Sequence, residues 1–210
     1  LLEGWATTSL AYFNLLDDKS WIFAPDGQAF VGYKVVGTTA VALGGPVGAP
    51  SSRSAAAREF VEHASLNGWT PVFHQVTEPE ARELSRLGLH PLKVGEEAII
   101  DLESWTLEGR GRKSIRSSVR RVQRAGYRVV ELSTPLDDDM LEELREVSDD
   151  WLVAGGHRER TFTLGRFDPE YLRRTPVMAV VVDAGTVSGR IVAFANVLPS
   201  YQSGDGNFDM

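Results

Sequence analysis

The chain has 210 residues, of which 42% are hydrophobic and 24% are charged, so it can bury a core and does not belong to the disordered class. It contains no cysteine, which excludes disulfides and thiolate metal sites, and none of its four histidines is paired with another at a metal-ligand spacing. No segment is apolar enough to span a bilayer and no signal peptide is visible, so we expect the chain itself to be soluble.

The predicted elements alternate between strands and helices, with antiparallel hairpins among them. In chain order we expect a short amphipathic helix at 5–17, strands at 21–24, 28–36 and 38–43, a helix at 54–67, a strand at 71–76, a helix at 78–87, a strand at 98–102, a basic helix at 112–126, a strand at 127–132, an acidic helix at 136–152, and strands at 177–182 and 190–198. This order favours mixed α/β layers over a doubly wound parallel sheet.

The order of hairpin and loop near residues 21–48 returns near residues 177–200, which indicates two similar α/β halves. We place the first half at residues 1–108, a basic linking helix at 109–126 and the second half at 127–210. The chain begins inside an apolar sequence and stops at Asp209-Met210 without a closing element. We therefore expect a fragment whose second half is incomplete.

One short segment concentrates positive charge on an acidic chain, which has 22 Lys and Arg against 29 Asp and Glu. Between Gly109 and Arg128 there is no acidic residue, and the basic residues are Arg110, Arg112, Lys113, Arg116, Arg120, Arg121, Arg124 and Arg128. Ile115, Val119 and Val122 recur at helical spacing, and an i, i+4 row of arginines lies roughly opposite them. Such a row of like charges disfavours an isolated helix, so we expect the apolar stripe to pack against something.

A charged helical face is most often simply solvated, but solvated faces usually interleave acids with bases, and this one has none. We therefore predict that the helix binds a phosphate-bearing partner. The candidate binding residues are Arg112, Lys113, Arg116, Arg120, Arg121 and Arg124.

Common catalytic motifs are missing from the sequence. There is no phosphate-binding loop, no dinucleotide fingerprint and no nucleophile elbow. Lys93 and Glu97 bring a cation and a carboxylate together before a predicted strand, and Asn196 interrupts an apolar strand. Although a surface loop is the default for Lys93 and Glu97, we retain all three as possible cleft residues.

Several motifs together resemble the catalytic domain of bacterial aminoacyl-phosphatidylglycerol synthases, also called the lysylphosphatidylglycerol synthetase or multiple peptide resistance factor family. Besides the basic helix, the matching segments are 30–33, 41–48, 93–98, 148–152, 162–167 and 191–196. Each motif is weak alone, but they follow one another in the family's order along the whole chain. Two departures stand out. The family's Gly-Asp-Pro appears here as Gly44-Gly45-Pro46, and Asp209-Met210 resembles only the start of its Asp-x-Met-Arg motif.

The resemblance implies a tandem acetyltransferase-like fold with the basic helix between the two halves. It implies transfer of a lysyl or alanyl group from aminoacyl-tRNA to phosphatidylglycerol at the cytoplasmic face of the membrane, with a transmembrane region elsewhere in the same protein. The aminoacyl ester is already activated, so no metal or other cofactor is expected. Asp209 is the candidate catalytic residue, either orienting the lipid hydroxyl or holding the substrate amino group.

Other functions remain open at the level of sequence. A related transferase could pass amino acids from tRNA to a peptidoglycan precursor. A module of the same fold that has lost its site could bind anionic membrane or RNA without catalysis. An acetyl-CoA-dependent acetyltransferase would need a glycine-rich pyrophosphate loop, which the sequence lacks.

Overall fold

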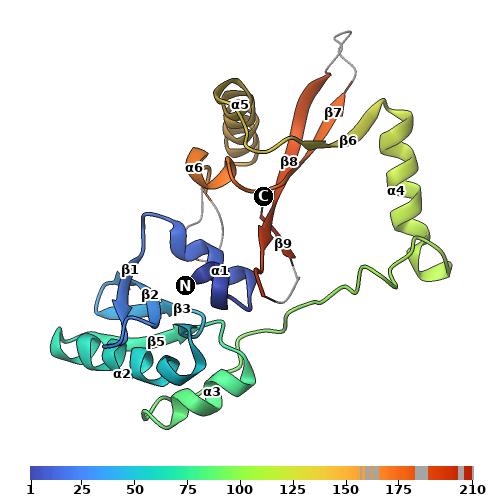
Figure 1. The fold of residues 1–210 in the computed structure, drawn as a ribbon. Helices are drawn as coiled ribbons and strands as arrows, with labels where there is room; N and C mark the ends of the chain where they lie inside the picture. Colours follow the sequence, from blue (N-terminus) through green and yellow to red (C-terminus); the bar gives the residue numbers. More distant parts are fainter. Residues whose placement is uncertain (157, 159–161, 163–165, 183–188, 203–205, 210) are drawn as a thin grey trace.

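The computed structural model contains two separate β-sheets. An extended arm, residues 88–124, joins them and stands away from both (Figure 1). It describes residues 1–210 except 157, 159–161, 163–165, 183–188, 203–205 and 210. This arrangement confirms the predicted mixed α/β class with two sheets.

The first sheet is mixed. Its strands are β1 (Ser20–Phe23), β2 (Ala29–Val36), β3 (Thr39–Leu43), β4 (Val47–Gly48) and β5 (Thr70–His74). Strands β1, β2 and β3 form an antiparallel meander, β4 pairs with β2, and β5 lies parallel to β3. A parallel pair needs a crossover connection, and α2 (Pro50–Leu66) supplies it. Strand β4 lies between the elements expected at 38–43 and 54–67, where no strand was predicted.

Small residues let α2 lie close to the first sheet. Ala56, Ala57 and Ala64 are buried beneath it, and Phe60 is completely buried between the rings of Tyr33 and Phe73. The helix begins four residues before its predicted start, because a proline is well tolerated in the first helical turn. Helix α3 (Glu78–Ser85) follows β5 and begins with a capping box.

The second sheet is antiparallel throughout. Its order is β6 (Tyr127–Leu132), β7 (Val177–Val182), β8 (Arg190–Pro199) and β9 (Gly206–Asp209). The acidic helix α5 (Asp138–Gly155) and the short helix α6 (Pro169–Leu172) lie on one face of this sheet. Leu144 of α5 and Val177 of β7 are completely buried in the resulting core.

The N-terminal residues join the core of the second sheet. In place of the single amphipathic helix predicted at 5–17, the structure has a short helix α1 (Leu2–Trp5) and a 3₁₀ segment η1 (Ser9–Leu15). Tyr12, Phe13 and Leu16 lie in the same hydrophobic cluster as Leu144. The start of the chain therefore connects the two sheets, which sequence periodicity could not show.

Ionisation of the Tyr12 phenol makes the stability of the folded chain depend on pH. Burial raises its pKa to about 12, with nearby Tyr201 adding to the effect and Arg174 opposing it. In the unfolded chain the phenol ionises near pH 10, so the folded state binds more protons between pH 10 and 12 and its stability falls as pH rises through that range.

We predict that Tyr12→Phe removes roughly 2 kcal/mol of this alkaline loss of stability. Urea unfolding of both proteins at pH 9, 10, 11 and 12 measures it, and the difference between the two profiles cancels titration of groups common to both. Parallel profiles would show that Tyr12 ionises freely in the folded protein.

Candidate functional site

The basic helix α4 (Lys113–Arg124) forms the outer side of the arm. A 3₁₀ turn, η2 (Arg110–Arg112), precedes it, and the chain turns into β6 at Gly126, which has a φ of 86°. The predicted helix and its glycine stop are therefore present.

Two of the predicted phosphate-binding residues hold the turn at the start of α4. The Arg112 guanidinium donates to the Thr106 carbonyl oxygen and lies 4.9 Å from the centre of the Trp105 ring. Arg116 donates to the carbonyl oxygens of Leu107 and Gly109, the latter at 2.7 Å. Both arginines are half-buried, and the Nη1 group of each donates to the backbone.

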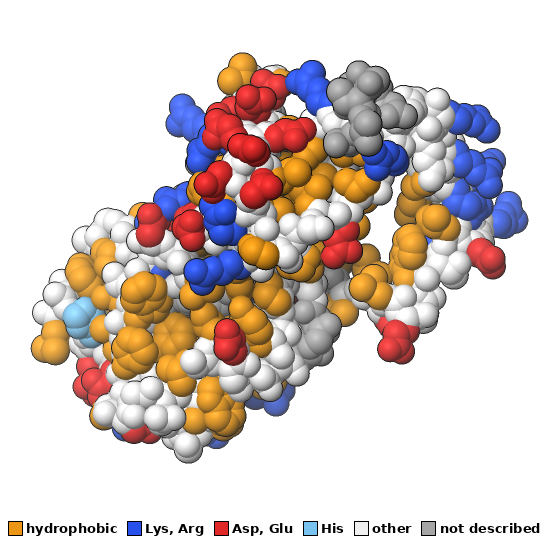
Figure 2. Space-filling model, turned by 45° about the horizontal axis from the view of Figure 1, so that its top comes forward, with side chains coloured by type: hydrophobic (Ala, Val, Ile, Leu, Met, Phe, Trp, Pro, Cys, Tyr) orange, Lys and Arg blue, Asp and Glu red, His pale blue; other side chains and the backbone are white. Residues whose placement is uncertain are grey.

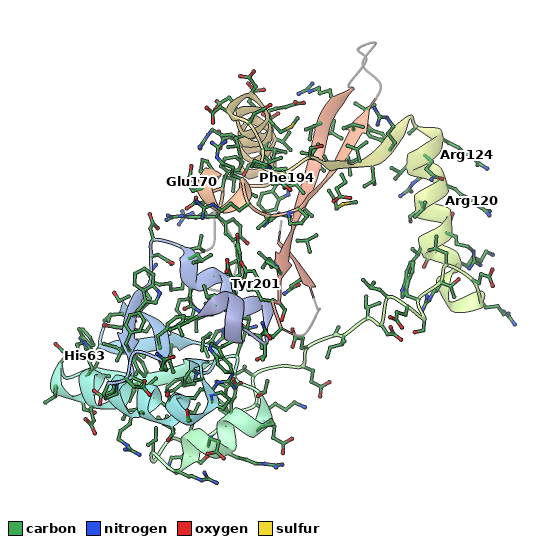
Figure 3. The ribbon with its side chains drawn as sticks, viewed as in Figure 1. His63, Arg120, Arg124, Glu170, Phe194 and Tyr201 are labelled. Atoms are coloured by element: carbon green, nitrogen blue, oxygen red, sulfur yellow. The ribbon has the colours of Figure 1, made fainter. Side chains whose placement is uncertain are left out.

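The other four predicted binding residues are exposed, and the structure shows no hydrogen bond or ion pair between them and another described residue: Lys113, Arg120, Arg121 and Arg124. Arg120 and Arg124 point away from both sheets (Figure 3). Figure 2 shows the Lys and Arg side chains of the arm gathered on its outward side. This outward basic face of α4 has guanidinium groups free to contact phosphates.

The three possible cleft residues do not come together. Lys93 and Glu97 lie on the exposed linker between α3 and η2, where Lys93 forms an ion pair with Glu96. Asn196 is buried in β8, and its Nδ2 donates to the Thr175 hydroxyl at 3.3 Å. That hydroxyl donates in turn to the Leu172 carbonyl oxygen at 3.1 Å. Lys93 and Glu97 thus fit the default surface-loop interpretation.

Strand pairing brings Asn196 next to the predicted catalytic residue. In the register of β8 and β9, Asn196 lies opposite Asp209. Strand β9 was not predicted, because a strand of four residues has little periodicity and its partner depends on the fold. The side chain of Asp209 lies outside the described residues, so its catalytic role stays a prediction.

A small pocket lies at the carboxyl end of β3, between the first sheet and the N-terminal segment. Its lining includes Thr7, Gly44, Gly45, Arg53 and Glu80. Ligands of open α/β sheets often bind at the carboxyl ends of parallel strands. Here the Glu80 side chain closes over the loop, and a Cβ on Gly45 would lie 2.3 Å from its Oε1 atom. A side chain at position 45 would therefore require the Glu80 side chain to move.

We predict that Gly45→Asp displaces Glu80, whose Oε2 accepts from the Thr77 N–H and hydroxyl at 2.8 Å each. Loss of that cap together with like-charge repulsion should lower the free energy of unfolding by about 1–2 kcal/mol. The loss should shrink in a Glu80→Ala background, as a double-mutant cycle would reveal. Gly95→Asp, at a site with open space around it, is the matched control. Equal losses in both backgrounds would contradict the contact.

An ion-pair cluster that sequence analysis missed links the residues before β1 with Phe162 and Arg166. Lys19 is fully buried, forms an ion pair with Asp18 and lies 5.0 Å from the centre of the Phe162 ring. Burial lowers the pKa of Lys19, although the adjacent carboxylate opposes this. Next to it, Arg166 forms an ion pair with Asp17. Phe162 and Arg166 belong to a motif singled out in the sequence, and here they contact Lys19 and Asp17 just before β1.

The described residues contain no helix long and apolar enough to cross a membrane. Within the same residues, no cluster of three or more histidines and carboxylates could hold a metal ion.

Comparison with known proteins identifies the family. The family model "Phosphatidylglycerol lysyltransferase, C-terminal" matches residues 1–207. The chain belongs to this family. It is 35% identical to a phosphatidylglycerol lysyltransferase of Bacillus subtilis over 202 residues, which is 96% of this chain and 23% of the relative. It is 28% identical to one from Staphylococcus xylosus over 210 residues, all of this chain and 24% of that protein.

Solved structures of the lysyltransferase family share the fold. L-PGS from Bacillus licheniformis superposes with a TM-score of 0.89 and 33% identity, covering 100% of this chain and 62% of that one. The C-terminal domain of a protein assigned as a lysylphosphatidylglycerol synthetase from Agrobacterium fabrum gives 0.86 and 30%, covering 97% and 63%. The predicted acetyltransferase-like class is consistent with these neighbours, and the family named from sequence motifs is confirmed.

Proposed function

We propose that this chain is part of a longer transferase that moves a lysyl group from lysyl-tRNA to phosphatidylglycerol. The observation that carries the proposal is the family match across residues 1–207, together with a named lysyltransferase relative that is 35% identical. That relative is far longer than this chain, so its activity is inferred for the whole protein that contains the chain. Alanine is the other amino acid that the sequence left open.

The reaction is a transesterification. A glycerol hydroxyl of the lipid attacks the carbonyl carbon of the aminoacyl ester, a new C–O bond forms, and the bond to the 3′ oxygen of the tRNA ribose breaks. The hydroxyl proton passes to that ribose oxygen. Since the ester is already reactive, positioning the two substrates can supply much of the rate. A carboxylate such as Asp209 would orient or deprotonate the hydroxyl, or hold the substrate amino group.

The outward basic face of α4 suits this reaction because both substrates carry phosphates. Lys113, Arg120, Arg121 and Arg124 have no described partner to compete with an incoming phosphate. Phosphate contacts give affinity and position with little sequence readout, which fits an RNA acceptor arm or a lipid headgroup. We propose that the protein works at the cytoplasmic face of the cell membrane, where both substrates meet, and that other parts of the same polypeptide include a transmembrane region.

A product assay tests the function. The longer protein is incubated with tRNA charged with labelled lysine and with vesicles containing phosphatidylglycerol, and the lipid fraction is extracted. We expect labelled lysine in that fraction, only when phosphatidylglycerol is present. Label from alanyl-tRNA alone would change the amino acid, and label on a peptidoglycan precursor would change the acceptor. Absence of lipid product with every charged tRNA would overturn the assignment.

A further inference from the structure

A completely buried lysine lies just before the first strand. The side chain of Lys19 has no exposed surface, and its Nζ forms an ion pair with Asp18. The other carboxylate oxygen of Asp18 lies 3.2 Å from Nζ of Lys34 on β2. Taking a charge out of water is costly, and a well-packed apolar side chain often stabilises a fold as much as a buried ion pair does, or more. Fold stability therefore does not account for a lysine at this position.

The ammonium group of Lys19 holds the ring of a residue far along the chain. Its Nζ lies 5.0 Å from the centre of the Phe162 ring, within the range of a cation–π contact. The centre of the same ring lies 6.1 Å from that of His74, at the end of β5. Phe162 has a φ of 85°, a strained conformation for a bulky residue that persists only where the surroundings enforce it. Lys19 and His74 supply such surroundings.

A second contact holds the chain a few residues later. Arg166 forms an ion pair with Asp17. The next residue, Phe167, has its ring centre 4.7 Å from the Arg145 guanidinium on α5 and 6.4 Å from the ring centre of Phe194 on β8. Phe194 packs against the core of the second sheet (Figure 3).

These contacts connect the start of the first sheet to β8. Residues 17–19 directly precede β1, and Phe194 precedes Asn196 on β8, where the backbone of Asn196 pairs with that of Asp209. Ion pairs and cation–π contacts depend on direction and distance, whereas apolar burial is non-directional. A cation at position 19 therefore fixes a geometry that an apolar side chain would leave loose.

We propose that Lys19 is a positioning residue for lysyl transfer. Through Phe162, and together with the Asp17–Arg166 ion pair, it sets the position of the second sheet relative to the first. It thereby places the paired strands β8 and β9, which carry Asn196 and Asp209. The catalytic part of this inference rests on the proposed function, whereas its geometric part does not.

A pair of neutral substitutions tests the role of the charge. In the longer protein, Asp18→Asn combined with Lys19→Met removes both charges of the buried pair and keeps the approximate shape of the side chains. We expect an unchanged or raised melting temperature, because the cost of burying the pair is gone. We also expect kcat to fall about ten- to a hundredfold with little change in KM for lysyl-tRNA, because misplaced reacting groups slow the chemical step.

The control for this pair is Arg82→Met, which removes an exposed cation from its ion pair with Glu78 on α3 and should keep the full rate. A kcat of the Asp18→Asn, Lys19→Met variant that stays at the wild-type value would overturn the proposal. So would a kcat that falls only in step with thermal stability, because the buried pair would then be purely structural.

Substitutions at Phe162 show whether Lys19 acts through the ring. Phe162→Tyr keeps the ring and should keep kcat, whereas Phe162→Leu removes it and should lower kcat about as far as Lys19→Met does. Combining Phe162→Leu with Lys19→Met should give no further loss, because both changes remove the same contact. Losses that multiply would show that the two residues act separately, which would contradict the proposal.

A distance measurement tests the geometry without reference to activity. The 210 residues contain no cysteine, so spin labels can be attached at Leu66→Cys on α2 and Val153→Cys on α5, which are 87% and 83% exposed, once cysteines elsewhere in the longer protein are replaced. Pulsed electron paramagnetic resonance should give a narrow distribution of distances with Asp18 and Lys19 in place, and a broadened or shifted one in the Asp18→Asn, Lys19→Met variant.

Identical distance distributions would overturn the proposal, whatever the rates. If the wild type makes no lysyl-lipid with any charged tRNA, the proposed function has failed. The distances alone then decide whether Lys19 sets the position of the two sheets.

Discussion

Replacing Asp209 with Asn is expected to lower kcat for lysyl transfer by about 10²- to 10⁴-fold, the usual contribution of a positioned acid or base. The backbone of Asp209 pairs with that of Asn196 in the second sheet. Asn has nearly the shape of Asp, so the pairing of β9 with β8 should survive. Initial rates of lysyl-lipid formation by the longer protein measure the effect.

The matched control for this change is Asp139→Asn, which alters an exposed carboxylate on α5 by the same chemistry and lies outside the segments that match the family. It should retain the full rate. If the Asp209 variant also retained its rate, Asp209 would have no part in the reaction. If both variants lost activity together with their thermal stability, the change would be structural.

Removing the three free arginines of α4 is expected to weaken tRNA binding strongly. The variant Arg120→Ala, Arg121→Ala, Arg124→Ala should bind tRNA about a hundredfold more weakly at low salt. The slope of log affinity against log salt concentration should also be smaller in magnitude by about two to three. The reason is that a protein that makes fewer phosphate contacts releases fewer counterions when it binds. Fluorescence titration of labelled tRNA over a salt series measures both quantities.

The control for charge alone is Arg58→Ala, Arg82→Ala, Arg86→Ala, which removes the same number of exposed arginines from α2, α3 and the C-cap of α3. It should leave affinity and salt dependence nearly unchanged. Arg112 and Arg116 are excluded from the variant, because they hold the turn before α4 and their loss would disturb the helix itself. Equal weakening by both triple variants would mean that binding follows net charge and not the basic face.

Local sequence signals predicted much of the fold. The apolar runs at 29–36 and 39–43 are local signals, as are the hydrophobic periodicity and glycine stop of α4, and the structure confirms those elements. Five of the six residues predicted to bind phosphate lie on α4, and Arg112 lies in the 3₁₀ turn η2 before it. The sequence could not separate Arg112 and Arg116, because their backbone partners belong to a turn whose shape depends on the fold.

The features that sequence analysis did not predict depend on contacts between residues far apart in the chain. Lys19 is buried because Phe162, which lies far along the chain, packs against it, and no periodicity indicates that contact. Strand β9 exists because β8 pairs with it. Conversely, residues 98–102 have the composition of a strand but no partner among the described residues, so the prediction of a strand there was wrong for this chain.

Steady-state kinetics of lysyl transfer most directly test the claim that binding and chemistry lie on different parts of the chain. The wild type, the Asp209→Asn variant and the triple arginine variant of the longer protein are compared over a range of lysyl-tRNA concentrations. The account predicts a raised KM with nearly unchanged kcat for the arginine variant, and a lowered kcat with nearly unchanged KM for Asp209→Asn. A fall in kcat without a rise in KM for the arginine variant would contradict it.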